Sequence, residues 1–410
     1  MYRNLIEDLI KIINEDSYLS IVLDNSINSL KLEDHDKKLY TMLLYGVVEK
    51  KMLIDYYLQP YIKGRRTKPF IKNALRLGAY AIDYTNIANH FIVNEIVSIV
   101  KKEDFRSSQF VNAILRSYIK DQRRNLDTLD ENTRISLKIG LDKEIVDLLV
   151  KQYKNKVVDF FSGGESYNTY RINTIKKDIA SVHKTLDDAN IVYTALDEAI
   201  ITKQSLIHTD LFRSGIIIAQ DYSSMQVAKV AYEPRFKDVL DCCSAPGGKS
   251  LHMASLMNNS GNILSCDIYQ TKLNKINDNA KKLGVTNITT LEASAIDYDY
   301  NKEFDLVICD VPCSGLGVIR HKPDLKLRMT IDKINEINKL QKDIINHVCK
   351  YVKNGGALVY STCTINKLEN EWLIKDFLRE HQEYKKVEEK IINPSEENDG
   401  FYICKLIKEK

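Results

Sequence analysis

The sequence predicts a multi-domain protein: an all-α N-terminal bundle, a small α+β linker domain and a C-terminal α/β domain with a doubly wound sheet. Three observations divide the 410 residues in this way. Residues 1–130 carry apolar side chains at helical spacing with almost no strand alternation. In residues 236–410, short apolar runs alternate with helical patterns, as in a parallel sheet covered by helices. Residues 131–235 mix both patterns.

Helical spacing runs through the N-terminal part. Leu5, Leu9 and Ile12 fall on one helix face, and a later helix is expected to end at Pro60. Pro69 suits the first turn of the next helix, where a missing N–H costs nothing. Two more helices are expected over residues 89–100 and 107–119. Helices with such short connections predict an all-α bundle.

The middle part combines two kinds of element. Helices are expected at Asp142–Tyr153 and Asp178–Ala189, and Tyr167–Asn173 alternates like a strand. Residues 191–195 and 200–202 have the composition of short strands. These patterns indicate an α+β domain between the bundle and the sheet.

The C-terminal part contains strands and helices in turn. Parallel strands are expected over residues 238–243, 261–266, 288–292, 304–309 and 356–361. Helices are expected over residues 249–257, 270–283, 331–352 and 368–381. Gly400–Leu406 has the pattern of a final strand. This order predicts a doubly wound sheet.

Composition excludes several classes of protein. The chain is 44% hydrophobic and 28% charged, which is typical of a globular protein rather than a disordered one. Its start lacks the pattern of a signal peptide, and no apolar run reaches the length of a membrane span, so we expect a cytoplasmic protein without a membrane partner. Eight cysteines in a chain of this length, several of them inside apolar strand patterns, indicate reduced thiols. No two of them have C-x-x-C spacing and the eight histidines are scattered, so we expect no metal site.

A glycine-rich turn, Cys243–Lys249, follows the first strand of the predicted sheet and opens a helix. Its two glycines let backbone N–H groups approach a ligand, and the helix N-terminus favours a carboxylate. The turn lacks the G-x-G-x-x-G spacing of nicotinamide sites. Asp267 ends the next strand, where an acid can accept hydrogen bonds from ribose hydroxyls. The sequence therefore predicts a site for a nucleotide-like ligand.

Two cysteines follow later strands of the same sheet. Cys313 stands three residues after Asp310, and Cys363 lies in the run Ser-Thr-Cys-Thr after the next strand. Because the carboxyl ends of parallel strands meet at one edge of a sheet, we expect these side chains beside the glycine turn. A thiolate is a strong nucleophile, so the pattern indicates covalent chemistry on a partner of the bound ligand.

These motifs, in this order, resemble the RNA cytosine-5 methyltransferases that use S-adenosylmethionine, and Gly215–Ser224 resembles the family's lead into its catalytic domain. In that family the Thr-Cys cysteine, here Cys363, attacks the base, and the Pro-Cys cysteine, here Cys313, helps release the product. An acid at the position of Asp310 can absorb charge from the attacked ring. Lys249 resembles a family lysine that also reaches the target base.

The resemblance also implies where the cofactor lies. S-adenosylmethionine would occupy the glycine turn, with its ribose on the carboxylate of Asp267. The family usually has an acid after the third strand that contacts the adenine; this chain has Ser294 there, and Asp297 is the alternative. The residues implied in cofactor binding are Cys243, Ser244, Ala245, Pro246, Gly247, Gly248, Lys249, Asp267, Ser294 and Asp310.

Two further segments accompany the cysteines. Arg320, His321 and Lys322 suit a phosphate beside a base that has left its stack, although a solvated rim is the alternative. Glu369-Asn370-Glu371 matches a motif of the family, and we interpret it as the start of a helix.

Basic residues cluster although the net charge is only +3. The first run contains Lys63, Arg65, Arg66, Lys68, Lys72 and Arg76. The second run contains Arg116, Lys120, Arg123 and Arg124. Such runs are either solvated helix faces or contacts for phosphates, which need cations but no particular base chemistry.

Asn94–Val97 and Phe110–Arg116 resemble the helical RNA-binding domain of the antitermination factor NusB, which also precedes one branch of the methyltransferase family. The resemblance implies that branch's substrate, a cytosine of small-subunit (16S) rRNA before subunit assembly, and we expect a monomer. Two alternatives stay open: a cytosine-5 methyltransferase acting on tRNA or another rRNA site, and an RNA-binding assembly factor with weak catalysis.

Overall fold

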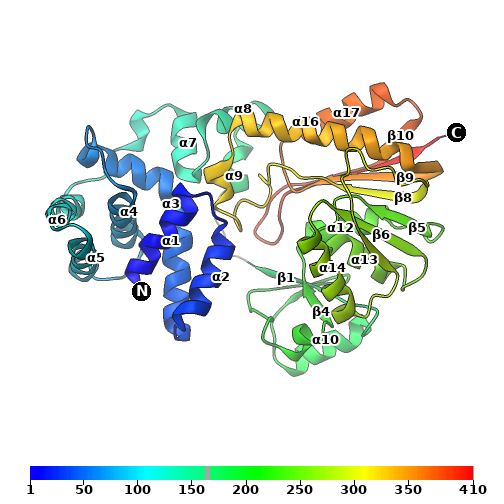
Figure 1. The fold of residues 1–410 in the computed structure, drawn as a ribbon, viewed down its shortest axis with the longest axis horizontal. Coiled ribbons are helices and arrows are strands. Elements are labelled where there is room, and N and C mark those ends of the chain that lie inside the picture. The colour runs from blue at the N-terminus through cyan, green and yellow to red at the C-terminus, as the bar shows by residue number, and fades with distance from the viewer. Residues whose placement is uncertain (162–166, 410) are drawn as a thin grey trace. The chain divides into compact units, whose positions relative to one another are not determined.

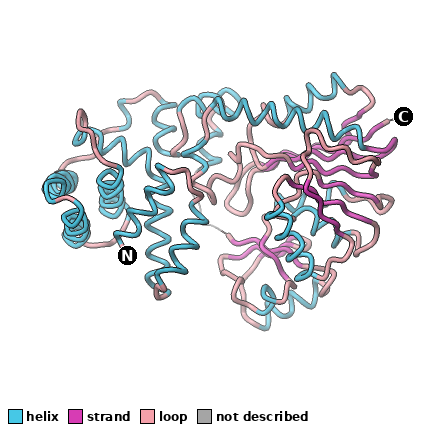
Figure 2. Tube along the Cα trace, viewed as in Figure 1, coloured by secondary structure: helices cyan, strands magenta, loops and turns pink. Residues whose placement is uncertain are grey.

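The computed structural model describes residues 1–161 and 167–409, and the chain divides into two compact units. One unit comprises Met1–Ser162 with the separate segment Ile319–Ile331, and the other comprises Gly163–Val318 with Asp332–Lys410. The first is built from helices, and the second carries the strands (Figures 1 and 2). The predicted fold class is confirmed. The domain limits at residues 130 and 235 stay predictions, and the first of them falls within the helical unit.

Residues 2–118 of the helical unit supply the buried side chains of one apolar core. Its elements are α1 (Tyr2–Asn14), α2 (Leu19–Leu30), α3 (Asp34–Ile62), α4 (Pro69–Tyr84), α5 (Asn89–Glu103), α6 (Phe105–Lys120), the 3-10 turn η1 (Leu126–Thr128), α7 (Glu131–Ile139), α8 (Lys143–Tyr153), α9 (Lys156–Phe161) and α15 (Leu325–Arg328). Among the described residues, no helix has the length and apolar composition needed to cross a membrane.

One helix end differs from the prediction. α3 continues two residues past Pro60, where we expected it to stop. Proline lacks the N–H that would bond to the carbonyl of Tyr56, four residues earlier. The guanidinium of Arg124 donates to that carbonyl at 3.2 Å, so the carbonyl oxygen keeps a partner and the helix can continue.

The second unit begins with a four-stranded antiparallel sheet in the order β2-β3-β1-β4. Its elements are β1 (Asn168–Ile172), α10 (Ile179–Asp188), β2 (Thr194–Leu196), β3 (Ala199–Thr202), α11 (Asp210–Arg213) and β4 (Ile217–Ala219). A small apolar core that includes Tyr170, Val182 and Leu211 lies between this sheet and its helices.

The larger sheet has seven strands in the order β10-β11-β9-β8-β5-β6-β7. Its strands are β5 (Asp238–Asp241), β6 (Asn262–Asp267), β7 (Ile288–Glu292), β8 (Phe304–Asp310), β9 (Val352–Thr362), β10 (Tyr384–Ile392) and β11 (Phe401–Lys408). β5 to β9 pair in parallel, while β11 pairs antiparallel with both β9 and β10. The final antiparallel strand is confirmed, whereas β10 had not been predicted.

Helices cover both faces of this sheet (Figure 1). They are α12 (Tyr222–Ala231), α13 (Gly248–Leu256), α14 (Gln270–Leu283), α16 (Ile331–Val348), the 3-10 turn η2 (Cys349–Tyr351) and α17 (Glu371–Glu380). α12, α13 and α14 share one apolar core with the sheet, and α16 and α17 share another. The chain leaves β5 toward β6 and later returns to β8 on the other side of β5. Ligands bind at such a reversal of strand order in open α/β sheets.

A buried ion pair ties α3 to α4 in the helical unit. Two guanidinium nitrogens of Arg76, a residue only 3% exposed, donate to the two carboxylate oxygens of Asp55 at 2.7 Å each. Breaking a buried pair leaves an uncompensated charge. We therefore expect Arg76→Met to lower the free energy of unfolding by about 3 kcal/mol, measured by calorimetry on the full chain, with the exposed Arg116→Met as the control.

The loss of stability in Arg76→Met should depend on pH, because it depends on the charge of Asp55. Burial alone would raise the pKa of Asp55, but the hydrogen bonds and charge of Arg76 outweigh it and hold that pKa below its ordinary value. A lowered folded-state pKa stabilises the fold above the unfolded pKa of about 4, and this stability is lost as the pH falls further. The difference between wild type and Arg76→Met should therefore shrink in acid, and a constant difference would contradict the assignment.

Candidate active site

A cavity of about 520 Å³ opens at the carboxyl edge of the seven-stranded sheet. Many of the predicted site residues line it, namely Cys243, Ala245, Asp267, Ser294, Asp310, Cys313 and Cys363. Apolar side chains that we had not predicted line the rest, among them Ile268, Ile296, Leu340 and Ile344. The cavity therefore joins two residues of the turn, the acid that ends β6 and the two thiols in one space. The other residues of the predicted turn are not among the lining residues, namely Ser244, Pro246, Gly247, Gly248 and Lys249.

The glycine turn owes its shape to local hydrogen bonds. The N–H and hydroxyl groups of Ser244 both donate to the carbonyl of Cys266 on β6, at 2.8 and 2.9 Å. Gly247 has φ +103°, and a Cβ there would lie 3.2 Å from Ile276 and Leu251. Gly248 then begins α13. Gly247 thus supplies a positive φ that residues with a side chain rarely adopt, directly before α13.

Asp267 ends β6 and is mostly buried at the cavity wall, with its side chain 11% exposed. One carboxylate oxygen accepts the N–H of Tyr269 at 3.1 Å, and the ammonium of Lys272 lies 3.6 Å from the same atom. Ser294 lines the cavity after β7, whereas Asp297 is exposed and is not among the lining residues. The structure thus favours Ser294 over Asp297 as the polar group facing a ligand.

Lys249 and Asp310 form an ion pair of 2.7 Å between the start of α13 and the end of β8. The hydroxyl of Ser361 donates to the other oxygen of Asp310 at 2.7 Å. Burial lowers the pKa of Lys249, but the charge and hydrogen bond of Asp310 outweigh it and raise that pKa overall. Lys249 therefore carries a firmly held positive charge beside the cavity.

The two thiols meet at the end of the adjacent strands β8 and β9. The sulfur atoms of Cys313 and Cys363 lie 3.2 Å apart. The pKa of Cys313 is raised, first by its hydrogen bond with Cys363 and then by burial. The backbone of the Cys363 loop is also fixed, because the N–H of Gly317 donates to the Cys363 carbonyl at 3.0 Å.

Arg320, His321 and Lys322 belong to the separate segment Ile319–Ile331 of the helical unit. Within that unit the carboxylate of Asp324 accepts the N–H of Leu19, at the start of α2, at 3.2 Å. Phosphate contact by Arg320, His321 and Lys322 stays a prediction.

The two basic runs differ in their surroundings. Arg65, Arg66 and Lys68 line a shallow cavity of about 270 Å³ together with Arg106, which the sequence analysis had not singled out. In the second run, Arg123 pairs with Asp83 at 2.6 Å and Arg124 lies 3.9 Å from the ring centre of Tyr56. Three residues of the first run are thus gathered at one open surface, whereas Arg76 of that run is buried against Asp55. The two arginines of the second run also have partners within the chain.

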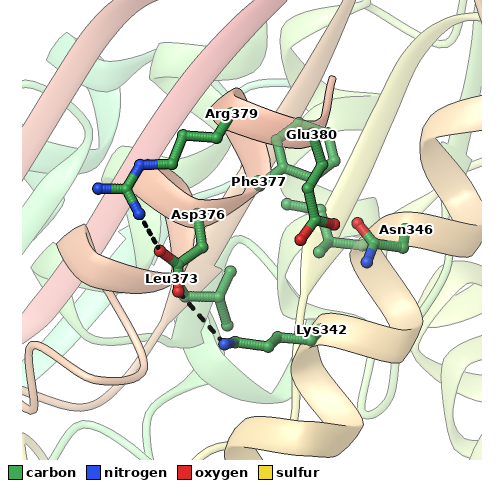
Figure 3. Close-up of a pocket in the computed structure, with 8 residues that line it drawn as sticks. Lys342, Asn346, Leu373, Asp376, Phe377, Arg379 and Glu380 are labelled. Carbon is green, nitrogen blue, oxygen red and sulfur yellow. Dashed lines mark hydrogen bonds and ion pairs between the residues drawn. The ribbon is translucent and has the colours of Figure 1, made fainter. Parts of the chain in front are cut away.

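A smaller cavity of about 150 Å³ lies between α16 and α17 (Figure 3). Its carboxylate Asp376 accepts from both Lys342 and Arg379 at 3.3 Å. The pair Lys342–Asp376 joins the two helices, and none of the lining residues is shared with the thiol cavity. We interpret it as a packing gap between paired charges.

Comparison with known proteins identifies both parts of the chain. A family model described as 16S rRNA methyltransferase RsmB/F matches residues 229–407, and the NusB family model matches residues 4–120. These matches cover the seven-stranded sheet and the first six helices, respectively.

Full-length relatives agree with this division. The probable ribosomal RNA small subunit methyltransferase B of Bacillus subtilis (strain 168) is 32% identical over 98% of this chain and 97% of its own length. A protein of the same name from Synechocystis sp. is 30% identical, over 90% and 87%. The crystal structure of PH0851 has a TM-score of 0.84 at 23% identity over 99% of both chains, which shows the same fold. The chain therefore belongs to the 16S rRNA methyltransferase RsmB/F family.

Proposed function

We propose that this protein transfers a methyl group from S-adenosylmethionine to C5 of a cytosine in 16S rRNA through a covalent bond between Cys363 and C6. The observation that carries the proposal is the thiol pair, with sulfur atoms 3.2 Å apart, at the edge of a cavity also lined by Asp310. A methyltransferase of this family takes its methyl group from S-adenosylmethionine.

The residues around the cavity fit this cofactor. The glycine turn leads into the N-terminus of α13, which suits the cofactor's carboxylate. Asp267 offers carboxylate oxygens to the ribose hydroxyls. Ile268 and Ile296 offer apolar contact for the adenine, and Ser294 offers a hydroxyl. When bound, the cofactor supplies an electrophilic methyl group.

Electrostatics support Cys363 as the nucleophile. Cys363 and the ammonium of Lys249 attract each other, an interaction that favours the thiolate. The hydrogen bond with Cys363 raises the pKa of Cys313, so Cys313 keeps its proton and donates to the neighbouring sulfur. The pair thus holds one nucleophilic sulfur and one protonated sulfur.

The first step forms a bond from the Cys363 sulfur to C6 and moves the ring electrons toward C5 and N3. Asp310 can receive a proton from the ammonium of Lys249 and share it with N3 as negative charge develops there, and the proton returns to Lys249 when the ring is restored. The electron-rich C5 then takes the methyl group. These steps leave a methylated base joined to Cys363, with one proton still on C5.

The second step uses Cys313. Once Cys363 is bonded to carbon, its sulfur is uncharged and only a weak hydrogen-bond acceptor, so the main cause of the raised pKa of Cys313 is weakened. Cys313 can then lose its proton to solvent and take the proton from C5. As that proton leaves, the bond between sulfur and C6 breaks and the Cys363 thiolate returns.

The NusB-like region supports the choice of RNA as substrate. Arg65, Arg66, Lys68 and Arg106 surround one shallow cavity, where α4 and α6 both begin. Helix N-termini and cations together suit phosphates. We infer that this surface holds the rRNA backbone, while the cavity of the sheet holds the target base.

Substituting the two thiols separately should stop the reaction at different stages. Cys363→Ala should form no covalent adduct with RNA, because the nucleophile is missing. Cys313→Ala should attack and transfer the methyl group but then stall, leaving a methylated protein–RNA adduct on denaturing electrophoresis. Adducts from Cys363→Ala and none from Cys313→Ala would reverse the roles.

Removing the carboxylate of Asp267 should weaken cofactor binding by about 1–3 kcal/mol, the cost of leaving charged hydrogen bonds unmade. Titration calorimetry of Asp267→Ala with S-adenosylmethionine measures this loss. Asp297→Ala is the matched control and should bind with wild-type affinity, because Asp297 is exposed outside the cavity lining. Equal affinities for all three proteins would exclude Asp267 as the ribose contact.

Neutralising the first basic run should weaken RNA binding and flatten its salt dependence. We expect the triple change of Arg65, Arg66 and Lys68 to Gln to reduce the slope of log affinity against log salt by roughly 0.9 for each phosphate that the protein no longer neutralises. Fluorescence anisotropy at several salt concentrations measures the slope. A triple change of Lys31, Lys37 and Lys38 to Gln removes the same charge elsewhere in the helical unit. If both triple variants lose the same RNA affinity and the same salt slope, the loss reflects net charge and not contact at this surface.

A further inference from the structure

A hydrogen bond joins the two cysteine loops directly behind the sulfur atoms. Ser314 follows Cys313, Thr364 follows Cys363, and their hydroxyl oxygens lie 2.7 Å apart. Both side chains are almost fully buried. The distance between the loops is therefore fixed by a contact that no solvent can replace.

The carboxylate of Glu369 sets the direction of this bond. One of its oxygens accepts from the Ser314 hydroxyl at 2.5 Å, and the other accepts from the Ser314 N–H at 2.8 Å. Because the Ser314 hydroxyl gives its single proton to Glu369, Thr364 must donate to Ser314. A chain of hydrogen bonds thus runs from the Cys363 loop through Ser314 to Glu369.

Two further side chains hold the carboxylate. The amide of Asn366 donates to one oxygen at 3.0 Å, and that of Gln341 donates to the other at 3.1 Å. The same amide of Gln341 also lies 2.9 Å from the carbonyl of Pro312, the residue before Cys313. Burial raises the pKa of Glu369, and the donors oppose this rise. Four donors on two oxygens suit a carboxylate, which has only acceptors.

The next residue binds the other loop. The side-chain oxygen of Asn370 accepts from the Thr362 hydroxyl at 2.6 Å, and its amide donates to the carbonyl of Thr364 at 2.9 Å. Thr362 and Thr364 flank Cys363. Glu369 and Asn370 therefore bind residues beside both thiols.

These contacts change the interpretation of the Glu-Asn-Glu motif. α17 does begin at Glu371, but its first turn receives no side-chain cap from Asn370. The side chains of Glu369 and Asn370 bind the cysteine loops instead. The ion pair of Lys342 and Asp376 joins α16, which carries Gln341, to α17 (Figure 3).

We propose that Glu369 is a positioning residue that holds the Cys313 and Cys363 sulfur atoms within reach of one base. It lies behind the thiols and acts on the reaction through Ser314 and Gln341, which it binds, and through Thr364, which Ser314 binds. The two proposed steps need both sulfurs at the same ring, one at C6 and one near the C5 proton. This role rests on the proposed function for its chemistry, whereas the placement of the thiols can be tested without it.

The test uses phenylarsine oxide, which bonds two neighbouring thiols and releases water. Glu369→Gln keeps the shape of the side chain but presents an amide N–H₂ to donors that need an acceptor. We expect it to form the bridge between Cys313 and Cys363 about tenfold or more slowly than wild type, the effect of losing one hydrogen bond to a charged group. Peptide mass spectrometry locates the bridge, and Cys313→Ser shows the background.

Glu371→Gln is the matched control, because it makes the same chemical change two residues along the chain and should bridge at the wild-type rate. Turnover with S-adenosylmethionine and RNA is measured in parallel, and the value of kcat should fall in Glu369→Gln while cofactor affinity stays unchanged. Normal bridging in folded Glu369→Gln would overturn the proposal, even if activity were lost. Slow bridging with no methylation by the wild type would instead refute the proposed function alone.

If Glu369→Gln does not fold, Thr364→Val provides the same test, since it removes the bridging hydroxyl and keeps the size of the side chain. Slow bridging in folded Thr364→Val supports the positioning role. Wild-type bridging in that variant overturns it.

Discussion

The register between β8 and β9 is the constraint on which the rest of the site depends. Asp310 pairs with Ser361 across the two parallel strands, and the Ser361 hydroxyl donates to the Asp310 carboxylate. Because of this pairing, the loops after β8 and β9 begin side by side at the same edge of the sheet. The sulfur atoms of Cys313 and Cys363 therefore lie 3.2 Å apart. A slip of one residue would turn one of these side chains to the other face of the sheet and separate acid from thiol.

The charges around the thiols follow from burial at this edge. Burial raises the pKa of Asp241 to about 7; the nearby charge of Asp310 adds to this rise and the hydroxyl of Ser250 opposes it. Asp241 therefore competes less for the ammonium of Lys249 than a fully ionised carboxylate would. Lys249 pairs with Asp310 instead, and its charge also interacts with Cys363. One cation thus contacts the Asp310 carboxylate and acts on the Cys363 sulfur.

The sequence predicts those features that depend only on local residue patterns and on the topology of a parallel sheet. Six of the seven strands of the large sheet could be predicted, and the rule that carboxyl ends meet at one edge predicted that Cys313 and Cys363 lie together. Contacts between distant residues that strand order does not set could not be predicted. Glu369 binds a residue 55 positions away, and the Tyr56 carbonyl that Pro60 leaves without its helical donor accepts from Arg124, far along the chain. The segment Ile319–Ile331 belongs to the helical unit, and no pattern in its own sequence predicts this.

The central claim is that Cys363 bonds to C6 of a cytosine while Cys313 serves the later elimination. A fragment of 16S rRNA with 5-fluorocytosine at the target position tests it most directly, because fluorine cannot leave C5 as a proton does. The wild-type protein should transfer the methyl group and then remain covalently attached, and tandem mass spectrometry of the joined peptide should place the bond on Cys363. A bond on Cys313, or no bond when the unmodified fragment is methylated, would contradict the account.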